Sequence, residues 1–221
     1  MQAYSQDMRR SFKERSVLMF NSIEEILVEL SEGKIIAIAD NEQLESEIDM
    51  MCLAEYATPE NINFMAKNAC GFICNVLSWD VAEAKGIDYL EQKGINNDHR
   101  GTPWARFLDA KDCDTGISAY ERSHTIKELS CTDKGIEHFV NGHVPVLKAR
   151  KGLLEERLGH TEMSSTLSYL CAGNGCAVIC EILAEDGHML RVENFAEFNK
   201  DKNLKIYSID QLIKDLKNMQ I

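Results

Sequence analysis

Short apolar runs alternate with capped helix starts along most of this chain, and this alternation constrains the fold more than any other feature. Residues 22–25 (SIEE) form a capping box that predicts a helix to about Glu32, where Gly33 is a natural stop. The apolar run 34–39 (KIIAIA) then predicts a buried strand. The same order of signals recurs toward the C-terminus, so we expect strands and helices mixed within one α+β domain.

The later elements are predicted from the same kinds of signal. Further helices are expected after Thr58-Pro59, over 78–84, 123–131 and 195–200, after Thr161, and from a second capping box at 208–211. Further strands are expected at 71–77, 144–149, 176–183, 188–192 and 204–207. The polar stretch 87–112 is predicted to be mostly loop. We therefore expect an N-terminal segment, 1–19, followed by a single domain over 20–221, with a mixed sheet and flanking helices.

Composition limits the partners of the chain. A net charge of −12 argues against nucleic acid and anionic membrane surfaces, but a few local cations would still allow a small anionic substrate. No apolar run reaches membrane-spanning length, and Met1 to Ser16 lack the apolar core of a signal peptide. The eight cysteines include no CxxC pair, so we expect buried free thiols in a soluble cytoplasmic protein.

Two polar segments carry the candidate chemistry. In the first, residues 157–162 (RLGHTE), Thr161 is the predicted N-cap of a helix whose N–H groups and dipole favour phosphate. Arg157 can add a planar charged fork to the same phosphate, and His160 can ligate a metal. The second, the acidic run 40–49, supplies hard oxygen ligands of the kind that Mg²⁺ prefers. Together they predict a site for a phosphorylated, oxygen-rich small molecule and a divalent ion.

Five motifs in order give the chain a recognisable family resemblance. They read DNEQLESEID at 40–49, DTGISAYER at 114–122, GHV at 142–144, RLGHTE at 157–162 and CEI at 180–182. In these motifs and their spacing, from about Phe20 to the C-terminus, the chain resembles 3,4-dihydroxy-2-butanone 4-phosphate synthase. That riboflavin-pathway lyase converts ribulose 5-phosphate to a four-carbon ketone phosphate and formate.

The resemblance implies a role for each motif residue. It implies Glu45 and His160 as ligands of Mg²⁺ (or Mn²⁺), His143 and Glu181 as proton-transfer groups, and Asp49, Thr115, Arg157 and Thr161 as ligands of substrate or phosphate. Proton-transfer groups are needed because the family reaction enolises a ketose, rearranges its skeleton and expels formate. The resemblance also implies a homodimer with active sites near the subunit interface.

Each assignment has a plainer alternative. An acidic run is often a solvated loop, and a histidine before a strand, such as His143, is often a structural hydrogen-bonding group. Arg157 could instead pair with Glu155, Glu156 or another surface carboxylate.

Several positions depart from the family motifs. Leu44 stands where the family has arginine, Ile48 and Leu158 where it has glycine, and Asp114 where it has threonine. Arg100 and Arg106 offer charge that could replace the one missing at Leu44. The departures indicate a diverged enzyme or, alternatively, an inactive homologue that binds a sugar phosphate or a partner. Retention of Glu45, His143, His160 and Glu181 favours the enzyme, because an inactive protein has no chemical need for all of them.

Overall fold

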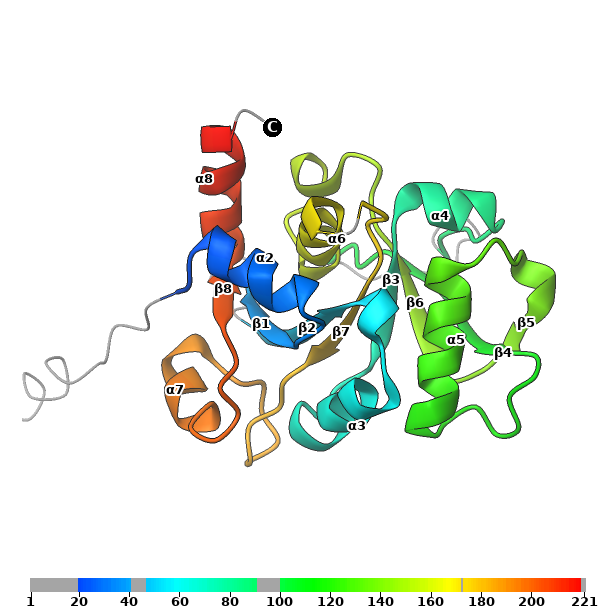
Figure 1. Ribbon diagram of the computed structural model, residues 1–221, viewed down its shortest axis with the longest axis horizontal. Helices are drawn as coiled ribbons and strands as arrows, with labels where there is room; N and C mark the ends of the chain where they lie inside the picture. The colour runs from blue at the N-terminus through cyan, green and yellow to red at the C-terminus, as the bar shows by residue number, and fades with distance from the viewer. Residues whose placement is uncertain (1–19, 41–46, 91–99, 172, 220–221) are drawn as a thin grey trace, which may run out of the picture.

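A computed structural model describes residues 20–40, 47–90, 100–171 and 173–219, which form one eight-stranded mixed sheet with helices on both faces (Figure 1). The strands are β1 (Ile36–Ala39), β2 (Ile48–Leu53), β3 (Cys74–Leu77), β4 (Trp104–Ala110), β5 (Phe139–Asn141), β6 (Val144–Lys148), β7 (Ala177–Glu181) and β8 (Ile206–Ser208). Their order across the sheet is β5-β4-β6-β3-β7-β2-β1-β8. The predicted mixed sheet with flanking helices is confirmed.

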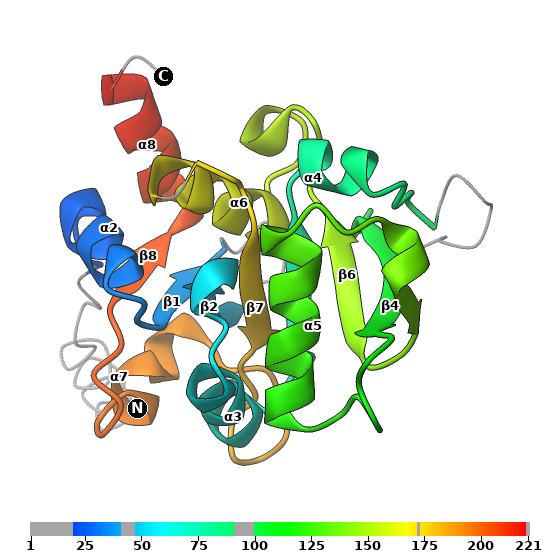
Figure 2. The same ribbon diagram turned by 45° about the vertical axis from the view of Figure 1, so that its right-hand side comes forward.

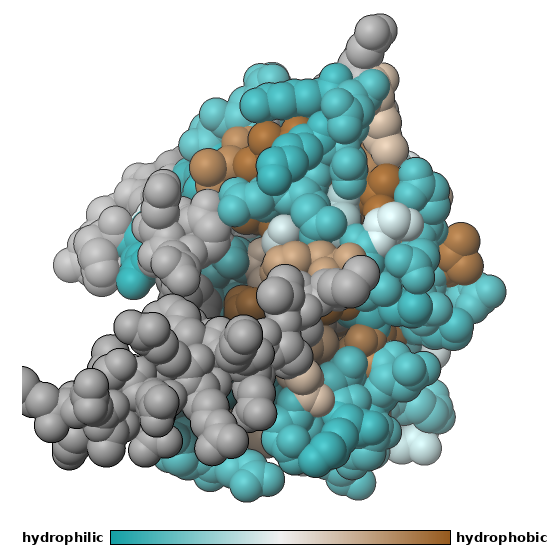
Figure 3. Space-filling view, turned by 90° about the vertical axis from the view of Figure 1, so that its left-hand side faces the viewer, coloured by the Kyte–Doolittle hydropathy of each residue, from teal (hydrophilic) through white to brown (hydrophobic). Residues whose placement is uncertain are grey.

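The helices divide between the two faces of the sheet, and each face has its own apolar core. On one face pack α2 (Ile23–Ser31), α6 (His160–Cys171) and α8 (Ile209–Met219). On the other pack α3 (Pro59–Asn68), α4 (Trp79–Ala84), α5 (Ala119–Cys131) and α7 (Phe195–Phe198). Figure 2 shows α3 and α5 in front of the strands. Figure 3, from the side of α2 and α8, shows a largely hydrophilic surface with some exposed apolar patches.

Strand directions bring three acidic residues to one edge of the sheet. β2 runs antiparallel to both β1 and β7, so β2 begins where its two neighbours end. Asp49 in β2 lies directly opposite Ile38 in β1 and Glu181 in β7, and Asp40 follows the end of β1. Residues that are far apart in sequence therefore meet at this edge.

Local capping explains where several helices begin and end. Ser22 and Glu25 form the predicted capping box, with the Glu25 amide donating to Ser22 Oγ and the Ser22 amide donating to Glu25 Oε2. Thr58 caps α3 by accepting from the amide of Asn61. Beyond the end of α2, Gly33 has φ +77°, the left-handed conformation that favours glycine.

Helix α6 is buried along most of its length although it is rich in hydroxyl groups. Its first nine residues, His160–Ser168, are all buried. The hydroxyls of Ser164 and Thr166 donate to carbonyls of the preceding turn, and those of Ser165 and Ser168 donate to the carbonyls of Gly175 and Cys176. The helix can therefore lie inside the protein without leaving these polar groups unpaired.

Some predicted elements were wrong. The stretch predicted as loop contains β4, which pairs with β5 and β6 and carries a register irregularity that weakens its sequence pattern. Strands β2 and β5 were not predicted, and α5 begins at Ala119 behind a Ser118–Glu121 capping box, earlier than expected. The predicted strand 188–192 forms only an isolated bridge between Leu183 and Met189. Helix α6 begins at His160, so Thr161 lies in its first turn and is not the N-cap.

The eight cysteines are free thiols, as predicted, and four of them are buried, whereas Cys70 and Cys131 are exposed. Burial raises the pKa of the Cys52 thiol to about 12 and that of Cys171 to about 11. Within the described ranges, no helix combines the length and the apolar character needed to cross a membrane. The expected cytoplasmic location stays a prediction.

The close approach of Tyr56 to Gly33 gives a test of the fold. A Cβ added at Gly33 would lie 2.8 Å from Tyr56 Cδ1, whereas one added at Gly187 has nothing within 4 Å. Both glycines have positive φ, so alanine at either site costs about 1–2 kcal/mol in backbone strain. We expect Gly33→Ala to lower the free energy of unfolding clearly more than Gly187→Ala does, as measured by urea denaturation. Equal losses would contradict the contact with Tyr56.

Candidate active site

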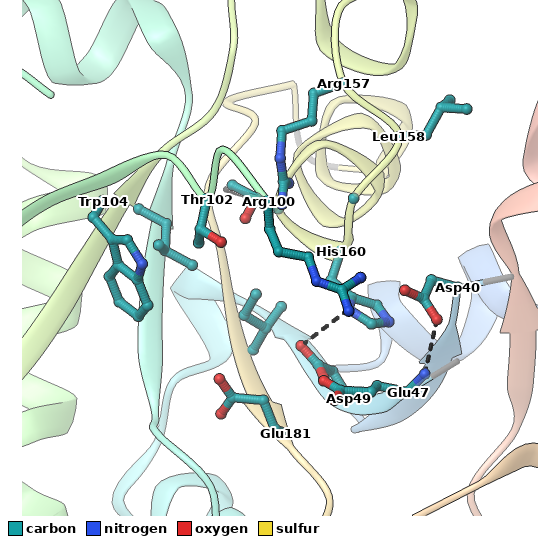
Figure 4. Close-up of a pocket in the computed structure, with 14 residues that line it drawn as sticks. Asp40, Glu47, Asp49, Arg100, Thr102, Trp104, Arg157, Leu158, His160 and Glu181 are labelled. Atoms are coloured by element: carbon teal, nitrogen blue, oxygen red, sulfur yellow. Dashed lines mark hydrogen bonds and ion pairs between the residues drawn. The ribbon is translucent and has the colours of Figure 1, made fainter. Parts of the chain in front are cut away.

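A pocket opens at the sheet edge where β1, β2 and β7 bring their acidic residues, beside the N-terminus of α6 (Figure 4). Its lining is acidic at Asp40, Glu47, Asp49 and Glu181, basic or polar at Arg100, Thr102, Arg157, Gly159, His160 and Thr161, and apolar at Trp104, Leu147, Leu158 and Ile179. Carboxylates, guanidinium groups and helix amides therefore share one small cavity. The pocket contains five of the residues predicted for the site: Asp49, Arg157, His160, Thr161 and Glu181.

Two acidic residues of the pocket are largely buried. Asp40 keeps 7% of its surface exposed and Asp49 keeps 2%. Asp40 Oδ1 accepts a hydrogen bond from the amide of Glu47 at 2.8 Å, and the amide of Asp40 donates to the carbonyl of Glu47 at 3.3 Å. These bonds join the end of β1 to the start of β2 and hold the Asp40 carboxylate in place.

His160 provides a candidate metal-binding nitrogen. Its Nδ1 atom lies 3.7 Å from Asp49 Oδ2, and Figure 4 shows the two side chains facing each other. Its Nε2 atom is buried without a hydrogen-bond partner among the described residues. Within those same residues, no group of three or more histidine, cysteine or acidic side chains is arranged to hold a metal ion. Glu45, the other predicted ligand, lies outside the described residues.

The imidazole and the neighbouring carboxylate fit a divalent cation. A buried ring nitrogen without a hydrogen-bond partner retains a lone pair in one tautomer, and a carboxylate supplies the hard oxygen that Mg²⁺ prefers. His160 and Asp49 provide both groups on one wall of the pocket.

Arg157 is paired with a buried carboxylate. Its Nη1 atom donates to Glu162 Oε2 at 2.7 Å, and the Glu162 side chain has no exposed surface. Burial raises the pKa of Glu162, while the charge of Arg157 opposes that shift. The partner is thus not a surface carboxylate, the alternative considered from the sequence, and Arg157 lies at the pocket wall.

The start of α6 is suited to bind an anion. The N–H groups of the first turn have no partner within the helix, and Gly159, His160 and Thr161 all line the pocket. A Cβ at Gly159 would collide with the guanidinium of Arg157, so a glycine here lets that side chain lie across the helix start. The helix end and Arg157 therefore form one positively polarised corner.

Glu181 lies on the opposite side of the pocket. Its Oε2 atom accepts a hydrogen bond from the amide of Phe72 at 2.8 Å, which holds the carboxylate at the end of β7. A Cβ at Gly71 would lie 2.6 Å from the same oxygen, so the chain before β3 approaches Glu181 closely. One oxygen is held by the backbone while the residue still lines the cavity.

His143 and Thr115 do not line the pocket. They belong to a second cluster, in which His143 lies against Asp109 and Thr115 precedes Gly116, which closes over the same carboxylate. His143 Nδ1 lies 2.7 Å from Asp109 Oδ2, and the His143 amide donates to Asp109 Oδ1 at 2.8 Å. A Cβ at Gly116 or Gly142 would collide with the Asp109 carboxylate, so both loops close tightly over it. The His143 side chain is 46% exposed, whereas that of Asp109 is 9% exposed.

Sequence reasoning missed Asp109 because it lies in β4, within the stretch predicted as loop. The signal available was the seven-residue run WARFLDA, with its aromatic and apolar residues. An aspartate near the end of a strand, positioned to meet His143, becomes recognisable only once β4 is placed beside β6.

Glu121 shapes the loop that carries Thr115. It accepts hydrogen bonds from the amides of Asp114 and Thr115, at 2.8 and 3.0 Å, and from the hydroxyls of Thr115 and Ser118. The hydrogen bond from the Gly116 amide, followed by that from the Ser118 side chain, lowers the pKa of Glu121 to about 2. Thr115 is held at the surface by this carboxylate.

The departures from the family motifs lie in different places. Leu158 is 39% exposed and lines the pocket, while Ile48 is buried at the start of β2. Asp114 is exposed and is not among the pocket residues, and Leu44 lies outside the described residues. Of the two arginines considered as replacements, Arg100 lines the pocket and Arg106 does not.

Helices on both faces of a mixed sheet, with a pocket of charged side chains at the strand ends, place the chain among layered proteins with a small-molecule pocket at one end of the strands. The sequence model of 3,4-dihydroxy-2-butanone 4-phosphate synthase matches residues 24–215, nearly the whole chain. The chain belongs to the 3,4-dihydroxy-2-butanone 4-phosphate synthase family.

Individual relatives agree with this assignment. The chain is similar to the riboflavin biosynthesis protein RibBA of Aquifex aeolicus, with 42% identity over 205 residues, 91% of this chain and 50% of the relative. RibBA of Bacillus velezensis is 41% identical over 88% of this chain and 49% of its own length. A solved 3,4-dihydroxy-2-butanone 4-phosphate synthase in complex with two magnesium ions has a TM-score of 0.83 and 29% identity, over 91% of this chain and 99% of that one. The chain thus spans about half of the length of these RibBA relatives.

The Glu121 hydrogen bonds predict an unusual titration. A pKa lowered from 4.5 to about 2 in the folded protein means that the charged carboxylate stabilises the 114–118 loop fully above pH 4.5. This stabilisation is lost as the pH falls through about 2. We expect a carboxyl-carbon NMR titration of Glu121 to have its midpoint near pH 2. Glu121→Gln should speed hydrogen exchange of the Thr115 amide, while Glu185→Gln, at an exposed glutamate in the turn after β7, should not. A midpoint near 4.5 would contradict the hydrogen bonds.

Proposed function

We propose that this chain is a lyase of the 3,4-dihydroxy-2-butanone 4-phosphate synthase type that acts on ribulose 5-phosphate or a closely related phosphorylated ketose. The observation that carries the proposal is the gathering of Asp49, Arg157, His160, Thr161 and Glu181 in one pocket, from segments far apart in sequence. These are residues to which the motifs assign substrate, metal and proton-transfer roles. Family membership and riboflavin-pathway relatives support the same reaction.

The role proposed for each pocket residue follows from the chemistry of its side chain. Arg157 and the first-turn amides of α6, with Thr161, bind the phosphate. Asp49 accepts hydrogen bonds from the sugar hydroxyls, and Glu181 moves a proton at the carbon skeleton. His160, together with Glu45, would hold Mg²⁺ (or Mn²⁺), which when bound polarises the substrate oxygens and stabilises an enolate. A relative in complex with magnesium supports a divalent cation.

His143 is proposed as the second proton-transfer group. Asp109 accepts a hydrogen bond from its Nδ1 in the tautomer that leaves Nε2 as the base, and that nitrogen belongs to a half-exposed ring. Because His143 does not line the pocket of its own subunit, we propose that the cluster of His143 and Thr115 completes the pocket of a second copy. Exposed apolar side chains near this cluster, at Phe72, Phe107, Ile117, Tyr120 and Val140, support a homodimer.

The departures from the motifs suggest that turnover of ribulose 5-phosphate is poor. Leu44 offers no donor to substrate oxygens, and Asp114 adds negative charge beside the Thr115 loop. The alternative is an inactive homologue that still binds a sugar phosphate. The observation favouring it is Leu158, an apolar side chain that stands at the pocket in place of a motif glycine. The two proposals differ in one measurable quantity, the release of formate.

The central test is formate release from ribulose 5-phosphate with Mg²⁺, followed by mass spectrometry of the four-carbon product. We expect product that disappears with chelator and in His160→Ala, at a rate at least about a hundredfold below that of a full-length RibBA relative. A loss of about 3 kcal/mol in transition-state binding is sufficient for that difference. Equal efficiency would show that the departures are neutral. Binding of a sugar phosphate without formate would favour the inactive homologue.

Complementation tests the shared site. His143→Ala and Arg157→Ala should each be inactive alone, while co-expression of the two should restore about a quarter of wild-type activity. Random pairing makes about half of the dimers mixed, and each mixed dimer contains one complete site. His138→Ala is the control and should remain active. His138 is an exposed histidine in the 3-10 turn Ile136–His138, directly before β5. A mixture that stays inactive, or an active monomer, would contradict the shared site.

A further inference from the structure

We propose that Glu162 is a positioning residue that holds the guanidinium of Arg157 against the pocket and, through Arg150, connects the pocket segment 100–102 to the same carboxylate. The inference deepens the proposed function, on which it rests, because it explains how the phosphate ligand is held. It concerns the third residue of α6, which does not itself line the pocket.

Both carboxylate oxygens of Glu162 accept hydrogen bonds. Oε2 accepts a hydrogen bond from Arg157 Nη1 at 2.7 Å, and Oε1 accepts one from the Arg150 amide at 3.2 Å. The side chain has no exposed surface, so the carboxylate has exchanged water for these two donors. A buried carboxylate that loses its partner is strongly unfavourable, and Arg157 therefore cannot rotate away without a large cost.

The pair leaves part of the Arg157 guanidinium available. Only Nη1 is bonded to Glu162, while Nε is buried with no hydrogen-bond partner in the part of the chain that the structure describes. The side chain is 19% exposed and lines the pocket. Because Nε is closed to solvent, an anion in the pocket would meet the exposed part of the guanidinium. Glu162 thus fixes one end of a planar fork and leaves its exposed part for a ligand.

A second set of contacts runs from Glu162 to the pocket segment 100–102. The Arg150 amide donates to Glu162, and Arg150 Nη2 donates to the carbonyl of Gly101 at 3.3 Å. Gly101 stands between two pocket residues, Arg100 and Thr102. The Arg150 guanidinium lies 4.6 Å from the centre of the Tyr89 ring, and the Tyr89 hydroxyl donates to the carbonyl of Ala149. One carboxylate thereby sets the spacing between Arg157 and the 100–102 segment.

A direct catalytic role for Glu162 does not fit its position. It is enclosed and absent from the pocket lining, so it acts through Arg157 and Arg150. Such a residue should affect ligand binding more than the chemical step, and its effect should depend on Arg157 being present.

The test compares Glu162→Gln with Glu156→Gln in the full chain. Glu156 lies in the same connection to α6, is exposed, and accepts a hydrogen bond from the Gly152 amide on Oε2 at 3.0 Å. Affinity for inorganic phosphate is measured by calorimetry, and KM and kcat are measured on ribulose 5-phosphate. We expect Glu162→Gln to weaken phosphate binding at least about tenfold and to raise KM more than it lowers kcat, with Glu156→Gln unchanged.

The double variant separates positioning from general stability. Because Arg157 is the link by which Glu162 affects phosphate, Arg157→Ala combined with Glu162→Gln should bind phosphate no more weakly than Arg157→Ala alone. Fully additive losses, or wild-type affinity in Glu162→Gln, would overturn the inference while leaving the proposed function intact. A wild-type protein that binds neither phosphate nor ribulose 5-phosphate would overturn the proposed function and this inference with it.

A second variant covers the case in which Glu162→Gln does not fold. Glu162→Asp keeps the charge but is shorter by one methylene, so it draws the guanidinium away from the pocket. Phosphate affinity should fall while the unfolding transition stays cooperative. Wild-type affinity in Glu162→Asp would also overturn the inference.

Discussion

Burial of the N-terminal turn of α6 is the constraint on which the pocket depends. The turn brings His160 and Thr161 between the sheet and the preceding connection, where neither remains more than 8% exposed. Such a position requires that every polar group nearby be satisfied or face a ligand. The hydroxyls of the helix satisfy themselves on backbone carbonyls, which leaves the helix end and the ring of His160 directed at the cavity. The packing that buries α6 thus also leaves the amides of its first turn facing the cavity.

The sequence predicted correctly those features that depend only on residues close together in the chain. Capping at Ser22 and Thr58 needs only neighbouring residues, and both caps were predicted correctly. The pocket residues were predicted from motifs, which encode an arrangement that periodicity alone does not show. Strand β4 was missed because its pairing with β5 and β6 is long-range and interrupted by a bulge. For the same reason Asp109 was missed: nothing near it in sequence indicates that His143 will lie against it.

The candidate chemistry divides between two clusters with different surroundings. Arg157 and His160 line a cavity in which their side chains are 19% and 9% exposed, whereas the ring of His143 lies half-exposed at the surface. The chain therefore combines a buried cavity and a solvent-facing cluster. The described residues do not bring His143 and Thr115 into the cavity that contains Arg157 and His160.

The corner around Asp109 limits how this sequence can change over time. Any side chain at Gly116 or Gly142 would occupy the volume of the Asp109 carboxylate, so those two positions stay closed to substitution while the aspartate remains. Replacing the aspartate with a smaller residue first would open space at both glycines but would leave His143 without its partner. Mutational paths through this corner must therefore cross an intermediate with an unsupported imidazole. Three positions from separate segments are in this way evolutionarily coupled.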